Sequence, residues 1–297
     1  MKKVLFATTA LIATAGMAAA DVSFGGYGRF GVLYNDANVG DETNVTHRFR
    51  LQIDATAESD SGVVFGARAR IQQNESDAIA EAGNSGTGIN GVRFFAKFGG
   101  VEVAVGNIYG ALEWMPGQYP IDLGLTGLGY EYTAYAFNAD AYSSGGAGSA
   151  GSNGVEVLYS AGDFSAHLSA SDTNDRIAAY VAYTFSGWTV ALGAQDSDAT
   201  TDTDWTATIS GSLGIADIAL AYADNGDNGD HVVLAGKFDV GASTNIEAYV
   251  ADADAYAETS LGVDFNHDLG GGTSLRGGVA RLGNDSVRAD LGVRFNF

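Results

Sequence analysis

The chain has 297 residues, including 42 glycines, two prolines and no cysteine, and its formal net charge at pH 7 is −21. Without cysteine a disulfide framework is excluded, so an exported chain of this length needs a closed sheet or a large core. No run of about 18 apolar residues follows the first twenty positions, which excludes helical membrane spans but leaves barrel strands open, since each barrel strand shows only about ten residues of alternating hydrophobicity.

The amino-terminal segment predicts export. Two lysines precede an apolar stretch at 4–17, and three alanines at 18–20 supply the small residues that a signal peptidase requires. We therefore predict a cleaved signal peptide over residues 1–20 and a single domain over residues 21–297. An anchoring transmembrane helix is the alternative, but the stretch is short, contains threonines and leads directly into strand-like sequence.

Apolar and polar residues alternate along sixteen segments after the leader. Because successive side chains of a strand point to opposite sides, each segment has one face suited to an apolar medium and one suited to water. Links after even-numbered segments are short, such as Gly99-Gly100, whereas most links after odd-numbered segments are longer and acidic. The predicted strands cover residues 22–34, 46–58, 62–72, 91–98, 101–106, 154–160, 163–170, 175–186, 187–195, 205–213, 214–222, 231–239, 244–251, 257–267, 273–281 and 286–297.

The alternation of short and long links is typical of an up-and-down barrel with tight turns at one end. A soluble β-sandwich or repeat protein is the alternative, because period two does not distinguish lipid from a protein core. The export signal, the strand number and the alternating last segment, which ends at Phe297, favour closure, which leaves no unpaired edge. We predict an all-β fold, a transmembrane up-and-down antiparallel barrel of sixteen strands.

Positive charge concentrates near the two ends of the mature chain. Of the thirteen basic residues beyond the leader, seven lie in the first four predicted strands and four, including Arg276 and Arg281, lie on or beside the last two. Closure brings these strands together, and all eleven except Arg281 have the parity of the polar face. An arginine facing lipid near the midplane costs about 2–4 kcal/mol, which independently favours the inner face. The predicted pore-lining basic cluster is Arg29, Arg48, Arg50, Arg68, Arg70, Arg93, Lys97, Arg288 and Arg294.

The connection at 107–153 is too long for a simple hairpin loop, and its aromatics and two prolines favour an ordered, functional segment. The segments LYSAGDFSAHLSAS, AAYVAYTFSGWTVALG, HDLGGGTSLRGG and ADLGVRFNF resemble the sixteen-stranded general porins of Gram-negative bacteria, in particular the Rhodobacter-type porins of alphaproteobacteria. The resemblance covers the mature length. It implies a homotrimer in the outer membrane, whose third extracellular loop folds into the barrel and narrows the lumen.

In that family the acids of the third loop face arginines on the opposite wall. Carried over to this chain, the constriction-loop acids are Glu113, Asp122, Glu131 and Asp140, and a solvated loop charge is the alternative for each. The PEFGG pattern of enterobacterial porins is missing, its nearest counterpart being EWMPG at 113–117, so the exact loop geometry is not carried over.

The predicted function is a water-filled channel for passive diffusion of small hydrophilic solutes and ions, with a transverse field between the basic wall and the acidic loop. Its partners are the lipid bilayer and lipopolysaccharide, with no nucleic acid and no required cofactor. A substrate-specific channel of the same architecture is the closer alternative. An outer-membrane barrel enzyme is disfavoured, since the four histidines lie on separate strands or at turns without a nucleophile motif.

Acid-rich loops raise the question of a structural cation. Asp224, Asp227 and Asp230 offer the oxygen ligands that Ca²⁺ prefers, as does the run of aspartates at 196–204. Neither loop has EF-hand spacing, and a solvated loop is the alternative.

Overall fold

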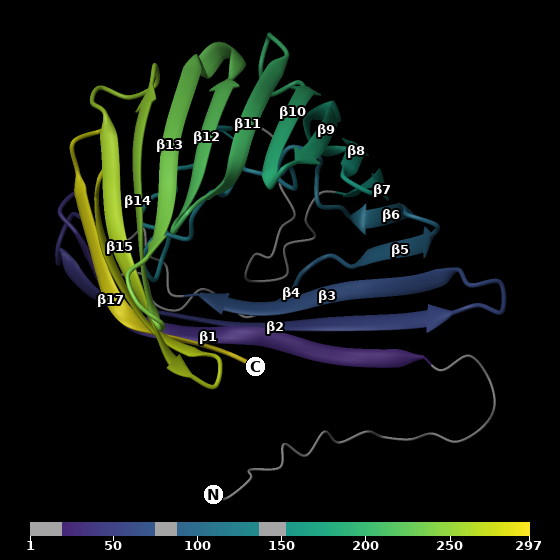
Figure 1. Ribbon diagram of the computed structural model, residues 1–297, viewed down its shortest axis with the longest axis horizontal. Coiled ribbons are helices and arrows are strands. Elements are labelled where there is room, and N and C mark those ends of the chain that lie inside the picture. Colours follow the sequence, from purple (N-terminus) through teal and green to yellow (C-terminus); the bar gives the residue numbers. More distant parts are fainter. Residues whose placement is uncertain (1–19, 75–87, 137–152) are drawn as a thin grey trace, which may run out of the picture.

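The computed structural model describes residues 20–74, 88–136 and 153–297, which form one closed antiparallel sheet (Figure 1). The predicted loop acid Asp140 and the predicted signal peptide, apart from Ala20, lie outside the described residues. β1 (Asp21–Asn35) pairs with β2 (Thr43–Glu58) on one side and with β17 (Val287–Asn296) on the other, which closes the ring. No helix of the described residues is long and apolar enough to cross a membrane.

Each remaining strand pairs with its neighbours along the chain. Two short 3₁₀ helices, η1 (Thr173–Asp175) and η2 (Gly226–Asn228), lie in loops at one end. The strands are β3 (Val64–Asn74), β4 (Gly88–Ile89), β5 (Arg93–Phe98), β6 (Val101–Asn107), β7 (Asn153–Ala161), β8 (Phe164–Ser171), β9 (Ile177–Phe185), β10 (Trp188–Asp196), β11 (Asp204–Leu213), β12 (Ala216–Asp224), β13 (Asp230–Asp239), β14 (Thr244–Ala253), β15 (Ser260–Gly270) and β16 (Thr273–Arg281).

β4 and β5 are one strand interrupted by a bulge, so the described ring has the sixteen strands that the sequence predicts. Both pair with β3, and the pairing register shifts by one residue between them. At the interruption Asn90 donates its backbone amide to Arg70 O (2.9 Å), while its side-chain Oδ1 accepts the Arg70 amide (2.6 Å). A side-chain oxygen thus replaces a backbone carbonyl, which is how a bulge keeps its neighbours satisfied.

The two faces of the sheet differ as the alternation predicts. From β1 to β17 every strand exposes large apolar side chains of one parity, such as Phe24, Phe94 and Leu291. The opposite parity carries the strand arginines except Arg281, most acids and many alanines, and much of it is buried. In a closed barrel the exposed apolar parity is the outer face, and such a continuous band requires lipid rather than water.

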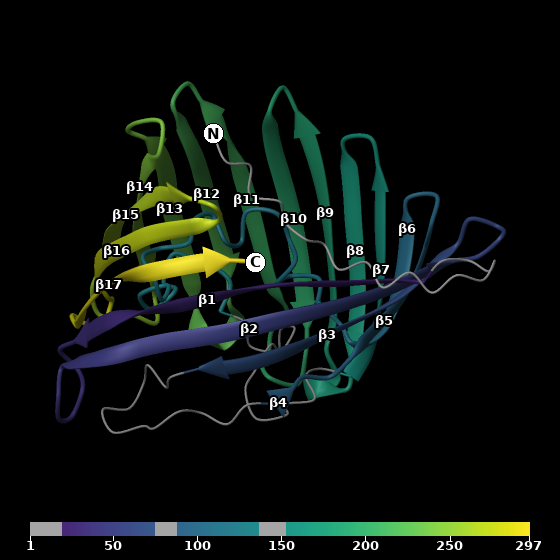
Figure 2. The same cartoon turned by 90° about the horizontal axis from the view of Figure 1, so that it is seen from below.

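Tight turns gather at the end of the barrel that holds both termini of the described chain. Gly99 and Gly100 join β5 to β6 with φ of 56° and 85°, the left-handed values that a two-residue hairpin turn needs. At the same end the amide of Gly26 donates to Phe297 O (2.9 Å) and the amide of Phe297 donates to Gly26 O (3.1 Å), so the last residue is tied to β1 (Figure 2).

One predicted boundary is displaced for a physical reason. The strand predicted over 257–267 begins only at Ser260. The backbone amides of Ala257 and Glu258 donate to Gly283 O instead of joining the ladder, at 3.1 and 2.9 Å. These residues therefore belong to a loop that packs on the following loop.

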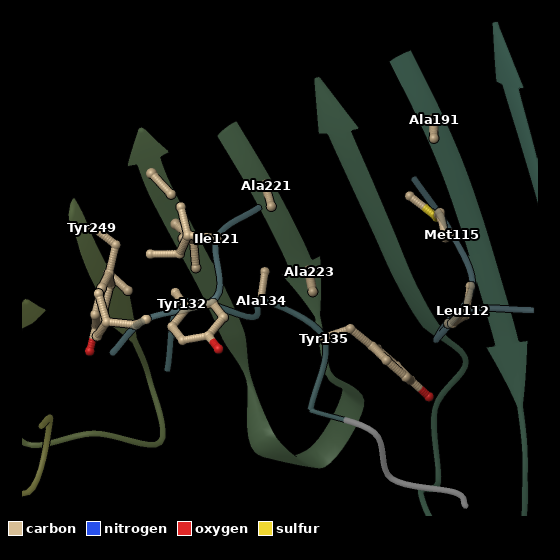
Figure 3. Close-up of a cluster of buried hydrophobic side chains, with 14 of the residues drawn as sticks. Leu112, Met115, Ile121, Tyr132, Ala134, Tyr135, Ala191, Ala221, Ala223 and Tyr249 are labelled. Carbon is tan, nitrogen blue, oxygen red and sulfur yellow. The ribbon is translucent and has the colours of Figure 1, made fainter. Parts of the chain in front are cut away.

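An apolar core lies inside the barrel, between the wall and the segment that follows β6. Leu112, Met115, Ile121 and Tyr132 of that segment pack against small residues of the wall, including Ala191, Ala221 and Ala223 (Figure 3). Alanine on the inner faces of β9, β10, β12 and β13 leaves the space that these larger side chains fill. This packing positions the functional site described next.

Candidate functional site

The segment 108–136, here called the inner loop, is held to the wall through its backbone. Asp290 on β17 accepts hydrogen bonds from the amides of Leu125 (3.0 Å) and Thr126 (2.7 Å) and from the Thr126 hydroxyl (2.8 Å). Two further wall carboxylates accept loop amides, Asp264 from Gly124 and Glu247 from Asp122. An ionised carboxylate is acceptor-only, so it suits a loop that presents several amides in succession.

The first residues of the inner loop are held from the other side of the barrel. Glu156 on β7 accepts the amides of Tyr109 (2.9 Å) and Gly110 (3.3 Å), and the Ser169 hydroxyl on β8 accepts the amide of Ala111 (2.9 Å). In the ring order β7 and β15 lie half-way round from each other. A segment anchored to both on their inner faces must cross the interior.

Four arginines of β2 and β3 form what we call the arginine ladder: Arg48, Arg50, Arg70 and Arg68. In the register between β2 and β3 each lies opposite a residue that is not basic, namely Asn74, Gln72, Gln52 and Asp54 respectively. Arg50 donates to Gln72, Arg70 to Gln52 (3.0 Å) and Arg68 to Asp54 (2.6 Å). Between β2 and β3 this arrangement avoids directly opposed like charges, which destabilise a sheet, whereas Arg48 faces Arg29 of β1 and Arg68 faces Arg93 of β5.

Tyr27 connects the arginine ladder to the closing strand. Its hydroxyl accepts a hydrogen bond from Arg48 (3.3 Å), and its ring lies beneath Arg50 and Arg294, with ring centroid to Cζ distances of 5.2 and 4.3 Å. Cations over an aromatic face are attracted by the ring quadrupole. One tyrosine therefore holds three guanidinium groups on β2 and β17 in place.

Arg93 is the most enclosed cation of this sector. Its guanidinium contacts Glu102 and Glu156, each at 2.6 Å, and lies 3.9 Å from the centroid of the Tyr109 ring. Trp114 stacks on the same ring at 4.1 Å and 7° between planes. Two groups this close to one centroid need opposite faces, so Tyr109 lies between Arg93 and Trp114, and the start of the inner loop is fixed against the basic sector.

The three predicted loop acids within the described residues have different surroundings. Asp122 Oδ2 receives Arg276 Nη1 at 2.6 Å and Arg294 Nη1 at 2.9 Å, and its side chain stays 54% exposed. Glu131 instead accepts the amide of Gly283 (2.8 Å) in the loop after β16, and burial raises its pKa. Glu113 is half-buried next to the exposed Trp114. The structure thus brings Asp122, among the described loop acids, into contact with two wall arginines.

The other predicted cluster members lie along the same sector. Arg29 is buried and donates to Leu125 O of the inner loop (2.5 Å). Lys97 is exposed near the tight turns, opposite Glu102 in the register. Arg288 is half-buried and lies opposite Asn35. Arg281, whose parity differs, contacts Asp285 (2.7 Å) and Glu258 (3.7 Å) at the long-loop end.

The sequence profile of the Gram-negative porin family matches residues 7–286. The chain belongs to the Gram-negative porins. It is 33% identical to a porin of Fuscovulum blasticum over 93% of this chain and 100% of that one, and 29% identical to a porin of Rhodobacter capsulatus with the same coverage. A solved triple mutant of the Rhodopseudomonas blastica porin superposes with a TM-score of 0.82 at 26% identity, covering 93% of this chain and 100% of its own.

The predicted resemblance and fold class are therefore confirmed, and the protein is an outer-membrane porin channel rather than an enzyme. The histidines of this porin lie on β2, β8, β13 and β15. His167 contacts Glu156 (2.9 Å) and His267 contacts the Thr244 hydroxyl (2.7 Å), which are contacts of wall packing.

The calcium prediction finds no support in the geometry of this porin. Asp227 accepts the hydroxyl (2.6 Å) and the amide (3.2 Å) of Thr201, and these hydrogen bonds lower its pKa. Asp224 accepts the amide of Gly226 (3.1 Å), and the amide of Asp230 donates to Asp254 (3.1 Å). Within the described ranges, no three His, Cys, Asp or Glu side chains are grouped to hold a metal ion.

The residues that sequence reasoning missed are the wall carboxylates that hold the inner loop. Glu156, Glu247, Asp264 and Asp290 all have inward parity in otherwise alternating strands. A single acid on the polar face of a barrel strand was the available signal. It does not distinguish an anchor from a pore-lining charge.

Proposed function

We propose that this porin passes small hydrophilic solutes and ions by passive diffusion through a lumen with a transverse field. The field runs between the basic wall, formed by the arginine ladder with Arg276 and Arg294, and the acids of the inner loop. The observation that carries the proposal is the pair of contacts from Asp122 on the loop to Arg276 and Arg294 on the wall.

The charge of the arginine ladder supports the same proposal. Arg48, Arg50 and Arg70 hydrogen-bond to tyrosine and glutamine side chains, which orient a guanidinium without cancelling its charge. In a narrow water-filled passage such a field orders water and aligns polar solutes. An apolar solute must displace that water, so permeation favours hydrophilic solutes and needs no energy source.

Export and assembly complete the proposal. The lysine, apolar and alanine pattern of residues 1–20 acts as a cleaved signal peptide. The mature porin assembles as a homotrimer in the outer membrane, where it contacts lipopolysaccharide. The mass of the detergent-solubilised protein by light scattering tests the trimer, and the amino-terminal sequence of protein isolated from outer membranes tests cleavage after Ala20.

Reversal potentials in planar bilayers test the transverse field. A variant with Arg48, Arg50, Arg68 and Arg70 changed to Gln is compared with the wild type under a KCl gradient. We expect its reversal potential to move toward that of a cation-selective channel, because the ladder no longer attracts chloride. Lys237→Gln on β13 is the matched control, since it removes a cation outside this sector. An unchanged potential in the fourfold variant overturns the proposal.

A further inference from the structure

A cavity of about 390 Å³ lies at the long-loop end, between the second half of the inner loop and the ends of β12 to β15. Its size falls within the roughly 300–1,000 Å³ of small-molecule sites. The residues that give it chemical character are Tyr119, Tyr130, Tyr135, Tyr256, Asn228 and Asp230. Its wall residues belong to β12 to β15 and their loops, whereas the arginine ladder belongs to β2 and β3.

The lining disfavours an anionic ligand. No lysine or arginine occurs among the described residues that line the cavity, and Asp230 adds a negative charge. Burial raises the pKa of Tyr256 to about 12, so its phenol stays neutral at physiological pH. The site therefore combines aromatic faces with neutral hydroxyl and amide groups, the set that suits a neutral, hydroxyl-rich ligand.

The tyrosine rings are held in position before any ligand arrives. Tyr130 has a left-handed φ of 61°, which is uncommon for a residue other than glycine. Its ring packs directly on Gly127, so closely that a Cβ at that position would lie 2.3 Å from the ring. The Tyr256 ring packs directly on Gly283, where a Cβ would also clash with it. It also packs edge-on against the His231 ring, with the ring centroids 5.5 Å apart. Both rings therefore need no costly ordering when they bind.

Two of the cavity tyrosines on the inner loop are accessible to a solute. Tyr119 is 46% exposed and Tyr130 is 45% exposed. Tyr119 also lines a second cavity of about 300 Å³ on the tight-turn side of the loop, together with Thr189, Ser210, Ser212 and Asp217. Hydroxyl and carboxylate groups therefore continue past the inner loop on this side of the barrel.

We propose that the first cavity binds a neutral saccharide, with the C–H face of a pyranose ring on Tyr130 and Tyr256 and its hydroxyls bonded by Asn228 and Asp230. An aromatic ring carries negative charge on its face, which attracts the weakly positive C–H groups of a sugar ring. The inference rests on the proposed function, because it adds a preferred class of solute to the same lumen. Tyr119 passes that solute from the first cavity to the second.

Single-channel recording of the purified full chain in KCl tests the inference with methyl β-glucoside as the probe. We expect a saturable fall in current as the glucoside concentration rises. Sorbitol, which has hydroxyls but no ring, is expected to lower the current only in proportion to viscosity. If the protein conducts KCl but the two solutes lower the current equally and without saturation, the inference is overturned. If no channel is seen at all, the proposed function is overturned instead.

Variants locate the site. Tyr130→Ala and Tyr256→Ala are expected to raise the half-blocking glucoside concentration about fivefold each, the loss of one stacked ring. Tyr183→Ala is the matched control, because this tyrosine is 53% exposed on the outer face of β9 and does not line the cavity. Its half-blocking concentration should equal that of the wild type. If both tyrosine variants show the half-blocking glucoside concentration of the wild type, the inference is overturned.

Discussion

Thr126 and Asp290 lie 164 positions apart in the chain, and the Asp290 carboxylate accepts both the backbone amide (2.7 Å) and the hydroxyl (2.8 Å) of Thr126. Asp290 belongs to the strand that closes the ring on β1. The inner loop therefore reaches its final position only when the last strand is in place.

Asp290→Ala is expected to loosen the inner loop without opening the barrel. It leaves the amides of Leu125 and Thr126 without their acceptor, at a cost of about 1–3 kcal/mol for each buried donor. Increased open-channel noise and faster proteolysis within the loop measure the effect. Asp290→Asn keeps one acceptor oxygen and should give an intermediate result. Noise and proteolysis equal to the wild type would contradict the role of this anchor.

Asp122→Asn is expected to make the channel more anion-selective. The change removes the loop charge between Arg276 and Arg294 and retains a hydrogen-bond acceptor of the same shape. The reversal potential under a KCl gradient measures it. Asp285→Asn is the control, since that carboxylate pairs with Arg281 at the long-loop end. A shift of the same size in the control would show that Asp122 has no special position.

Arg93→Gln is expected to destabilise the barrel more than Arg68→Gln. The Arg93 side chain is 2% exposed and contacts two carboxylates, whereas Arg68 is 26% exposed and contacts one. Removing one partner of a buried ion pair costs about 3–5 kcal/mol, because the remaining charges stay buried. Urea unfolding in lipid vesicles measures the two free energies. Equal losses would contradict the difference in burial.

Because burial raises the pKa of Glu131, we expect this residue to make the protein less stable as pH rises. Its folded-state pKa is raised above its unfolded value, so its contribution is fully present below the unfolded pKa of about 4.3 and is lost as pH rises through the folded pKa. Glu131→Gln keeps an acceptor for the Gly283 amide and carries no proton to lose. The free energy of unfolding of the wild type should therefore fall relative to this variant with rising pH. Parallel pH profiles would refute the assignment.

The sequence predicts the strands well because each strand of this porin has one face in an apolar medium. The alternation that ends at Phe297, for example, follows from the two media on either side of the wall, so it is visible in the sequence without knowledge of the contacts that β17 makes. The interruption between β4 and β5 is different, because the Asn90 side chain replaces a backbone carbonyl there. Nothing in the sequence distinguishes an asparagine with this role from any other asparagine near a strand.

The site is less predictable than the wall, since it depends on the path of the inner loop. Inward parity identified the sector of the arginine ladder, but parity alone gives Asp290 and Asp54 the same description. One holds the loop and the other pairs with Arg68. Asp122 and Glu131 likewise have similar sequence surroundings, and only the folded loop takes one to the arginines and the other to Gly283.

The register of β2 and β3 gives the arginine ladder a direction. Arg48, Arg50, Arg70 and Arg68 occupy four successive levels from the long-loop end toward the tight turns. With a rise of about 3.3 Å per residue, neighbouring levels are about 7 Å apart along the strands. We therefore expect an anion that passes this wall to contact one level of the ladder at a time, so that attraction at the entrance does not become tight binding at the centre.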